Sequence, residues 1–284
     1  KTHENIKTIR PLKDGVIADF HAAEHMIRGM IKMIDNNKKF FPVSHRMVIC
    51  IPSGITEVEK RAVRDSAEHA GAKEVYMIQE PIAAAIGIGI EIEKPFGSMI
   101  IDIGGGTTEI AIIALSGIVT DQSIRTAGDS FTADIIDYMK RQHNLLIGER
   151  SAETIKIEVG SAMTELKDAP EDLDIRGRDL VTGIPKVVKI SYSEIGFAMD
   201  KSISKIEDAV LKALENAPPE LSADIYDNGI YLTGGGALLR GLDKRLALKT
   251  KLHVHVAEDP LKAVVRGTGM ALRNLESFKP VLMN

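Results

Sequence analysis

The sequence predicts an α/β fold in which parallel strands are joined by helices, and three observations support this prediction. Helical and strand-like apolar patterns alternate through the first third of the chain. Two later apolar runs each end in three consecutive glycines, a pattern typical of a strand that brings the backbone close to a ligand. The chain has 284 residues, of which 44% are hydrophobic and 27% charged, which excludes a disordered protein and favours two domains.

The charge and the cysteine content narrow the class of protein. Lysine and arginine together number 36 and aspartate and glutamate 40, which gives a net charge of −4. Because there is no basic excess, we expect no nucleic-acid partner. Cys50 is the only cysteine, which excludes a disulfide within the chain and fits a reducing, cytoplasmic setting. No apolar run approaches the roughly 20 residues of a membrane-spanning helix.

The first predicted elements are a helix and a strand. Apolar residues recur every three or four positions from 19 to 35, which places them on one face of a helix. An apolar run over 46–51 then predicts a strand, and Pro52 ends it because proline cannot donate to a sheet ladder.

A second helix and a second strand follow in the same order. Thr56 and Glu59 have the spacing of a capping box, and Gly71 suits the end of the helix that they open. An apolar run over 74–78 predicts the strand, and the small residues after Pro81 predict a third helix. Strands that alternate with helices in this way are expected to pair in parallel.

A boundary is predicted at residues 94–97, where Lys-Pro-Phe-Gly breaks the alternation. Beyond it, two apolar strands flank the first three glycines and predict a hairpin. The predicted elements of this part are strands over 98–103 and 110–115, helices over 129–143 and 151–166, strands and turns within 170–192, a helix over 193–214, a strand over 229–233, and helices over 237–248 and from Asp259 to about 275.

The two glycine runs have the chemistry of phosphate loops. Glycines directly after a buried strand allow positive φ angles, and successive amide groups in such a bend form an anion-binding concavity. Beside Gly104, Gly105 and Gly106, the hydroxyl groups of Thr107 and Thr108 can donate to phosphate oxygens, and Asp102 can hold a hydrated Mg²⁺. The alternative is a pair of ordinary tight turns. Neither run has the lysine of a Walker A loop or the spacing of a dinucleotide fold.

The second run is predicted to open directly into a helix. Gly234, Gly235 and Gly236 precede Ala237, where that helix is expected to begin, so the helix N-terminus would also favour an anion.

Several motifs carry a resemblance to a known family. Asp102-Ile-Gly-Gly-Gly-Thr-Thr-Glu109 resembles the second phosphate loop of the superfamily that contains actin, heat-shock chaperones and sugar kinases, and Leu232-Thr-Gly-Gly-Gly-Ala-Leu-Leu239 resembles its adenosine-binding loop. The segments 79–85, 148–156 and 217–221 narrow the resemblance to the MreB family of bacterial actin homologues. The likeness covers nearly the whole chain.

The resemblance implies an actin-like fold of two lobes with ATP (or GTP) and Mg²⁺ in the cleft between them. Glu80 would orient the water that attacks the γ-phosphate, Asp102 would hold the metal through water, and Thr107 would complete the catalytic set. Without the resemblance, Glu80 is only a carboxylate at a strand end, and Glu153 with Lys156 is a surface ion pair. The implied nucleotide-binding residues are Gly104, Gly105, Gly106, Thr107, Glu153, Thr154, Ile155, Lys156, Gly234, Gly235, Gly236 and Ala237.

The resemblance also implies a domain organisation. Lobe I would comprise 1–95 plus 263–284, lobe II would comprise 96–133 plus 198–262, and 134–197 would form a small inserted subdomain. Family members begin with a strand and a first phosphate loop, which nothing in this sequence matches, so we expect this chain to be N-terminally shortened and the activity of the shortened chain to be weak.

The implied function is that of a filament-forming cytoskeletal protein with a slow ATPase coupled to polymerisation, which positions cell-wall synthesis and maintains rod shape. Its partners would be further copies of itself in head-to-tail filaments, the inner face of the cytoplasmic membrane, and membrane proteins of cell-wall synthesis. The alternatives are a chaperone-type and a sugar-kinase-type ATPase of the same superfamily.

Three weaker patterns each have a simpler interpretation as well. Phe40 and Phe41 follow two lysines in a predicted loop, which suits contact with an anionic membrane surface, although both rings could instead begin the core of the next strand. The His21-Ala-Ala-Glu-His25 and His253-Val-His255 patterns match metal-binding spacings, but a solvated helix face and a polar strand edge are the favoured interpretations.

Overall fold

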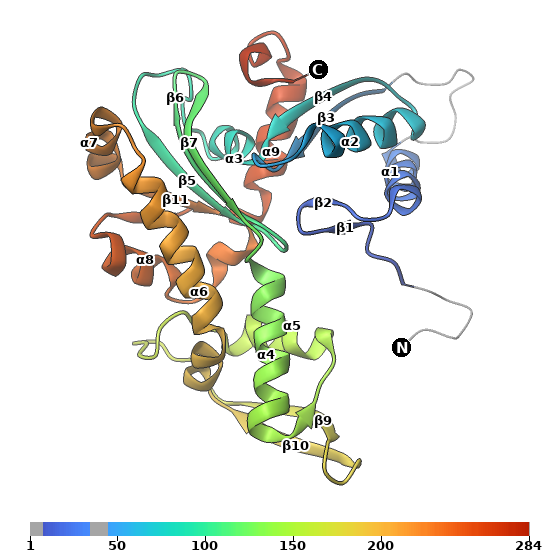
Figure 1. Ribbon diagram of the computed structural model, residues 1–284, viewed down its shortest axis with the longest axis vertical. Coiled ribbons are helices and arrows are strands. Elements are labelled where there is room, and N and C mark those ends of the chain that lie inside the picture. The colour runs from blue at the N-terminus through green and yellow to red at the C-terminus, as the bar shows by residue number, and fades with distance from the viewer. Residues whose placement is uncertain (1–7, 35–44, 284) are drawn as a thin grey trace.

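The computed structural model describes residues 8–34 and 45–283 (Figure 1). Phe40 and Phe41 therefore lie outside the described residues, and their membrane role stays a prediction. None of the helices within the described ranges combines the length and the apolarity needed to cross a membrane.

The largest sheet has five strands in the order β12-β11-β5-β6-β7. The predicted hairpin is confirmed, because β5 and β6 pair in antiparallel fashion around the first glycine bend, and β11 runs parallel to both β5 and β12. The edge strand β7, which pairs with β6, was not predicted. The bounds are β5 Ser98–Ile103, β6 Thr108–Ala114, β7 Gly117–Ile124, β11 Ile230–Thr233 and β12 Val254–Val256.

Apolar side chains leave both faces of this sheet, which is why β5 and β6 are buried along their whole length apart from the first residue of β5. Met99, Ile101 and Ile103 point into one core cluster, which also contains residues of α4 (Gly128–His143) and α6 (Tyr192–Glu215). Ile100 belongs to a second cluster, which contains the apolar residues over 82–86 of α3 (Glu80–Gly87). Helices thus cover both faces, as an α/β fold requires.

The first part of the chain forms the predicted parallel strand pair. β3 (His45–Ile51) and β4 (Ala72–Gln79) pair in parallel and are connected by α2 (Glu57–His69), whose capping box of Thr56 and Glu59 is confirmed. Before them come a short hairpin and a helix: β1 Leu12–Lys13, β2 Val16–Ile17 and α1 Phe20–Ile34.

The C-terminal helix α9 (Ala263–Arg273) returns to this first part of the chain and packs against α3 (Figure 1). A Cβ atom on Gly267 would lie 1.8 Å from the carbonyl oxygen of Ala83, and one on Gly87 would lie 1.8 Å from that of Ala263. The two helices therefore touch through their backbones, which only glycine permits at these two positions. Met283 then pairs with Met77 of β4.

A smaller group of elements lies at the lower end of the molecule in Figure 1. The strands expected within 170–192 are present as an antiparallel pair, with a two-residue strand added at its edge. The elements of this group, besides α4, are β8 Leu145–Leu146, α5 Glu149–Val159, β9 Leu173–Asp179 and β10 Pro185–Ile190.

Three predicted helices are corrected by the structure. The helix expected over 151–166 ends at Val159, where Gly160 becomes extended and a Cβ atom would lie 2.2 Å from a carbonyl oxygen. The helix expected over 237–248 is two pieces, because Gly241 has a left-handed φ of 74°. The pieces are the 3₁₀ helix η1 (Gly235–Leu238) and α8 (Leu242–Thr250). The last helix begins only after the 3₁₀ turn η2 (Pro260–Lys262), and α7 (Pro219–Asn228) was not predicted.

Candidate functional site

Both glycine bends line one cavity of about 1050 Å³. They meet there because β5 and β11 are parallel neighbours, with Thr233 paired to Asp102, so the bends leave the same edge of the sheet side by side. The cavity is lined by Arg10, Asp102, Gly104, Gly105, Gly128, Asp129, Phe131, Glu149, Arg150, Glu153, Thr154, Lys156, Ile157, Gly234, Gly235, Gly236, Leu238, Leu239, Pro260, Leu261 and Val264.

The bends are built so that no residue larger than glycine fits at their point of contact. Gly234 has a φ of 79°, and a Cβ atom on it would lie 2.3 Å from the carbonyl oxygen of Ile103. A Cβ atom on Gly105 would meet nothing closer than the Asp129 carboxylate at 4.0 Å, so a side chain there would project into the cavity that this glycine lines. Among the described residues, no carbonyl or side-chain oxygen accepts from the amide groups of Gly105 and Gly106. The donor set therefore fits an anion with phosphate groups.

A second cavity of about 440 Å³ adjoins the first, and Glu80, Asp102 and Thr107 all line it. The two cavities share Asp102, Gly104 and Gly105. The turn between β1 and β2 forms another wall, because a Cβ atom on Gly106 would lie 2.9 Å from the Cα atom of Asp14. The three residues predicted to be catalytic are thus brought together at the end of the phosphate-loop bend.

Two carboxyl groups, the buried Asp102 and the half-buried Glu80, dominate the electrostatics of this second cavity. Asp102 is 6% exposed and accepts a hydrogen bond of 2.8 Å from the Thr233 hydroxyl group. Burial raises the pKa of Asp102 to about 6. Burial, together with the charges of Asp102 and Glu109, raises the pKa of Glu80 to about 8. A carboxyl group with a pKa near neutrality can exchange a proton with water at working pH, which is the property of a general base.

The helix α5 forms the opposite wall of the larger cavity. Lys156 donates to the Gly128 carbonyl at 3.0 Å and to the Thr132 hydroxyl at 3.1 Å, and it pairs with Glu153 at 2.8 Å. Its side chain is 15% exposed, so the interpretation as a solvated surface ion pair is wrong for the lysine. Thr154 also lines the cavity, and its hydroxyl donates to the Arg150 carbonyl at 3.0 Å.

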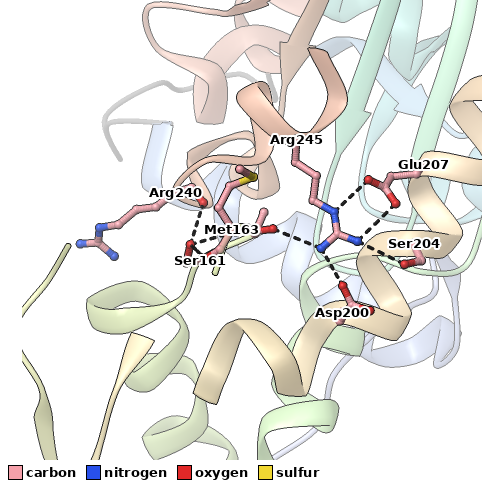
Figure 2. Close-up of polar contacts among 8 residues, drawn as sticks. Ser161, Met163, Asp200, Ser204, Glu207, Arg240 and Arg245 are labelled. Carbon is pink, nitrogen blue, oxygen red and sulfur yellow. Dashed lines mark hydrogen bonds and ion pairs between the residues drawn. The ribbon is translucent and has the colours of Figure 1, made fainter. Parts of the chain in front are cut away.

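A polar cluster centred on Arg245 joins α8 to α6 and to the segment that follows α5 (Figure 2). Arg245 of α8 pairs with both oxygens of Glu207 at 2.8 and 3.2 Å and donates to the Ala162 carbonyl at 3.1 Å. Asp200 completes its shell at 2.8 Å. Two such oriented hydrogen bonds from one guanidinium fix geometry as well as charge. The segment that follows α5 is thereby fastened to α8, beside the cavity wall that Leu239 forms.

Three sequence-based expectations are corrected at this site. Ile155 and Ala237 lie outside both cavity linings, since both side chains are buried in the core cluster. The hydroxyl group of Thr108 donates to the Thr126 carbonyl at 2.7 Å and is not available to a phosphate. The second bend leads into a 3₁₀ helix of four residues, so the expected contribution of an α-helix N-terminus is absent there.

Of the predicted site residues, Asp102 is the one that was expected to hold a metal ion. In the part of the chain that the structure describes, no three His, Cys, Asp or Glu side chains gather as a metal site, and the two histidine patterns form none. Magnesium is commonly held by one or two carboxylates together with substrate phosphates and water. Asp102 at the junction of the two cavities fits that arrangement.

Sequence reasoning missed several residues that line the site. Arg10 pairs with Glu149 at 2.5 Å and with Asp129 at 3.7 Å, and it lines both cavities. No local pattern marks Arg10, because its partners lie more than 100 residues further along the chain. Gly128 and Asp129 also line the larger cavity and were missed. For these two residues a signal was available, because a glycine at the start of a helix suits a close approach to a ligand.

Comparisons with known proteins agree on one family. The family model described as MreB/Mbl protein matches residues 1–280. The cell shape-determining protein Mbl of Bacillus subtilis is 49% identical over 278 residues, which are 98% of this chain and 82% of that protein. The cell shape-determining protein MreB of Escherichia coli K12 is 48% identical over 276 residues, which are 97% of this chain and 79% of that protein.

Solved structures give the same result. The crystal structure of MreB5 of Spiroplasma citri bound to ADP matches with a TM-score of 0.89 and 41% identity, over 97% of this chain and 82% of that one. The MamK double helical filament matches with a TM-score of 0.77 at 21% identity, over 93% of this chain and 80% of that one, and thus shares the fold.

The actin-like α/β fold predicted from the sequence is therefore confirmed, and the chaperone and sugar-kinase alternatives are not favoured. With a family model matched over nearly its whole length and relatives close to half identical, the chain belongs to the MreB/Mbl family of cell shape-determining bacterial actin homologues.

Proposed function

We propose that this protein binds ATP with Mg²⁺ in the paired cavities, hydrolyses it slowly, and couples that cycle to filament assembly. One observation carries the proposal: the two glycine bends meet in the larger cavity. Asp102 lines both this cavity and the smaller one, which Glu80 also lines. The related MreB5 of Spiroplasma citri was solved with ADP and with AMPPNP, which supports a nucleotide in this place.

The chain's own residues divide the chemical work. The amide groups of Gly105 and Gly106 and the Thr107 hydroxyl donate to phosphate oxygens, while the Gly104 amide donates to the Thr107 carbonyl and holds the bend closed. Glu80 orients water and accepts its proton. Asp102 would hold Mg²⁺ through water, and that ion would neutralise phosphate charge. Gly234–Gly236 face the nucleoside.

The α5 wall completes the proposed site. Glu153, Thr154 and Lys156 would contact the ribose and the base, since all three line the larger cavity. Ile155 and Ala237 support the walls from within the core.

We propose the division into lobes that the resemblance implies, with 1–95 plus 263–284 as lobe I, 96–133 plus 198–262 as lobe II, and 134–197 as the small subdomain. The packing of α9 on α3 supports the return of the C-terminus to lobe I. Glu80 then belongs to lobe I and Asp102 to lobe II, so closure of the lobes on a nucleotide would bring the catalytic groups together.

Sedimentation tests the central proposal. The protein is expected to pellet after addition of ATP with Mg²⁺ and to stay in the supernatant without nucleotide, because head-to-tail contacts between copies form open filaments rather than closed rings. ADP serves as the control and is expected to give a smaller pellet. Equal pellets with and without nucleotide, or no binding of AMPPNP, would contradict the proposal. GTP in a parallel series would establish the preference for the base.

We also propose a cytoplasmic location at the membrane, with membrane proteins of cell-wall synthesis as partners. Phe40 and Phe41 follow two lysines in the sequence. In the adjoining last turn of α1, Met33 is 86% exposed and Ile34 is 77% exposed, which extends the apolar character of this region. Aromatic and apolar side chains beside lysines favour an anionic lipid surface.

The double change Phe40→Ser with Phe41→Ser is expected to lower binding to vesicles of anionic lipid by about tenfold or more, because burial of two aromatic side chains contributes several kcal/mol. Co-sedimentation with phosphatidylglycerol vesicles measures this. The double change Val181→Ser with Ile184→Ser is the matched control, since both residues are exposed and lie in the β9–β10 hairpin. Unchanged binding of the phenylalanine variant would remove the membrane role.

A further inference from the structure

Four polar residues form a continuous row across the large sheet. Thr233 of β11 pairs with Asp102 of β5, Asp102 pairs with Glu109 of β6, and Glu109 pairs with Ser123 of β7. Directly paired residues lie on the same face of a sheet, so all four side chains share one face. The row crosses the sheet next to the phosphate-loop bend, which begins at Gly104, two residues beyond Asp102.

Glu109 is the member of this row that the proposed function leaves unexplained. It is fully buried, and a buried carboxylate is costly unless donors surround it. Three donors do so. Ser53 supplies its amide at 3.1 Å and its hydroxyl at 2.6 Å to one oxygen, and Ser123 supplies its hydroxyl at 2.7 Å to the other.

The Ser53 contact connects parts of the chain that belong to different proposed lobes. Ser53 lies in the turn after β3, and the end of β3 pairs with the end of β4, where Ile51 is opposite Gln79. Glu80 is the next residue after Gln79. Glu109 lies on β6, opposite Asp102. Its carboxylate therefore connects β6 to the end of the β3–β4 pair, from which Glu80 follows.

The same turn is confined on both sides. A Cβ atom on Gly54 would lie 3.3 Å from the Cβ atom of Ser123, and one on Gly15 would lie 2.9 Å from the ring of Pro52. The turn over 52–54 thus sits between β7 and the β1–β2 turn, which itself contacts Gly106. Movement of this turn would change the position of Glu80 relative to the phosphate bend.

We propose that Glu109 is a positioning residue, which accepts from Ser53 across the lobe boundary and thereby sets Glu80 at its working distance from Asp102 and the phosphate-loop bend. This inference rests on the proposed ATPase function. Glu109 lines neither cavity, so it does not contact the nucleotide and acts through the turn that it holds.

Two serine variants test the proposal as a matched pair. Ser53→Ala and Ser123→Ala each remove one hydroxyl donor from the same carboxylate, but only the first breaks a contact between the lobes. Ser53→Ala is expected to lower kcat for ATP by about tenfold, because small displacements of a catalytic group are costly, with KM within twofold of the wild-type value. Ser123→Ala is expected to leave both within twofold, because the β6–β7 ladder holds its strand in place.

Two further variants separate positioning from other effects. Ser53→Thr keeps the hydroxyl group and is expected to restore most of kcat. Glu109→Gln keeps an oxygen for both Ser53 donors and can donate to the Ser123 hydroxyl, so its kcat is expected to stay within threefold of the wild-type value. Glu109→Ala removes the acceptor, and its kcat is expected to fall at least as far as that of Ser53→Ala. If Ser53→Ala folds poorly, the kcat values of Glu109→Gln and Glu109→Ala still test the positioning role, and equal values would contradict it.

The outcomes also separate this inference from the proposed function. If the wild-type protein hydrolyses no ATP, the proposed function fails. If the wild type is active but Ser53→Ala and Ser123→Ala give equal kcat values, the positioning role of Glu109 is overturned while the ATPase stands. Hydrogen exchange of the amides over 52–56, with AMPPNP bound, gives a readout without turnover, and of the two serine variants only Ser53→Ala is expected to accelerate it.

Discussion

Replacement of Glu80 by glutamine is expected to lower ATP turnover by about 100-fold to 10,000-fold while the affinity for nucleotide stays within threefold. Glutamine has the shape of glutamate but cannot accept the proton of the attacking water. Glu80 lines the smaller cavity with Asp102 and Thr107, away from the α5 wall where the nucleoside is proposed to bind. Phosphate release measures turnover, and titration with AMPPNP measures affinity.

Glu74→Gln is the matched control for this variant. Glu74 lies on β4, the strand that leads to Glu80, but its half-exposed carboxylate pairs with Arg46 at 3.1 Å. Its turnover is expected to equal that of the wild type. Normal turnover by Glu80→Gln would exclude Glu80 as the base and would move the search to the remaining groups of the smaller cavity.

The same substitution is expected to change how stability depends on pH in the absence of nucleotide. Burial, then the charges of Asp102 and Glu109, raises the pKa of Glu80 from 4.5 to about 8. A raised pKa means that the folded protein favours the neutral carboxyl group. Its contribution to stability is therefore complete below pH 4.5 and is lost as the pH rises through 8.

Glutamine is neutral at every pH, so the stability of Glu80→Gln relative to the wild type is expected to increase between pH 5 and pH 8. Urea unfolding of the nucleotide-free protein at both pH values measures the difference. A difference that does not change with pH would mean that Glu80 is ionised throughout this range.

Local signals in the sequence were sufficient for much of the fold. The capping box at Thr56 and Glu59, the parallel pair β3–β4 and the hairpin around the first glycine bend all follow from short-range patterns, and all are present. By contrast, β7 was missed because it is an edge strand whose middle is polar. Residues such as Asp121 and Gln122 make this segment look like a loop in the sequence. The break at Gly241 was missed because a single glycine within a helical pattern is ambiguous.

The site was predictable where its residues stand in a motif and unpredictable where they depend on tertiary contacts. Asp102 and the glycines adjoin one another in sequence, so a bend could be recognised. Ser53 and Glu109 are 56 positions apart, and the hydrogen bond between them becomes visible only when the turn after β3 is placed against β6. Ile155 was misplaced because the residues on either side of it face the cavity, while helical periodicity turns its own side chain into the core.

Substitution of Gly267 by alanine is expected to destabilise the protein by about 3 kcal/mol. Alanine normally favours a helix over glycine by about 1 kcal/mol, so on an isolated helix the effect would have the opposite sign. Here the added methyl group would lie 1.8 Å from the carbonyl oxygen of Ala83, and 2.9 Å from the Gly87 amide nitrogen. Backbone atoms cannot rotate out of the way, so α3 and α9 would have to separate. Urea unfolding measures the loss.

Gly269 provides the control within the same helix. A Cβ atom at this position meets no atom within 4 Å, so Gly269→Ala is expected to stabilise the protein by up to about 1 kcal/mol. The pair therefore predicts opposite signs for the same substitution two residues apart. Equal effects of the two variants would show that α9 does not depend on its contact with α3.

The consequence of Gly267→Ala should extend to the nucleotide site, because both partners of this helix contact carry residues of the cavities. Val264 lies one turn before Gly267 and lines both cavities, while α3 begins with Glu80 itself. Separation of the helices would move these two groups apart, and the affinity for AMPPNP is expected to fall together with stability. A destabilised variant that keeps full affinity would mean that the site is held by the large sheet alone, and that the C-terminal helix serves only to stabilise the fold.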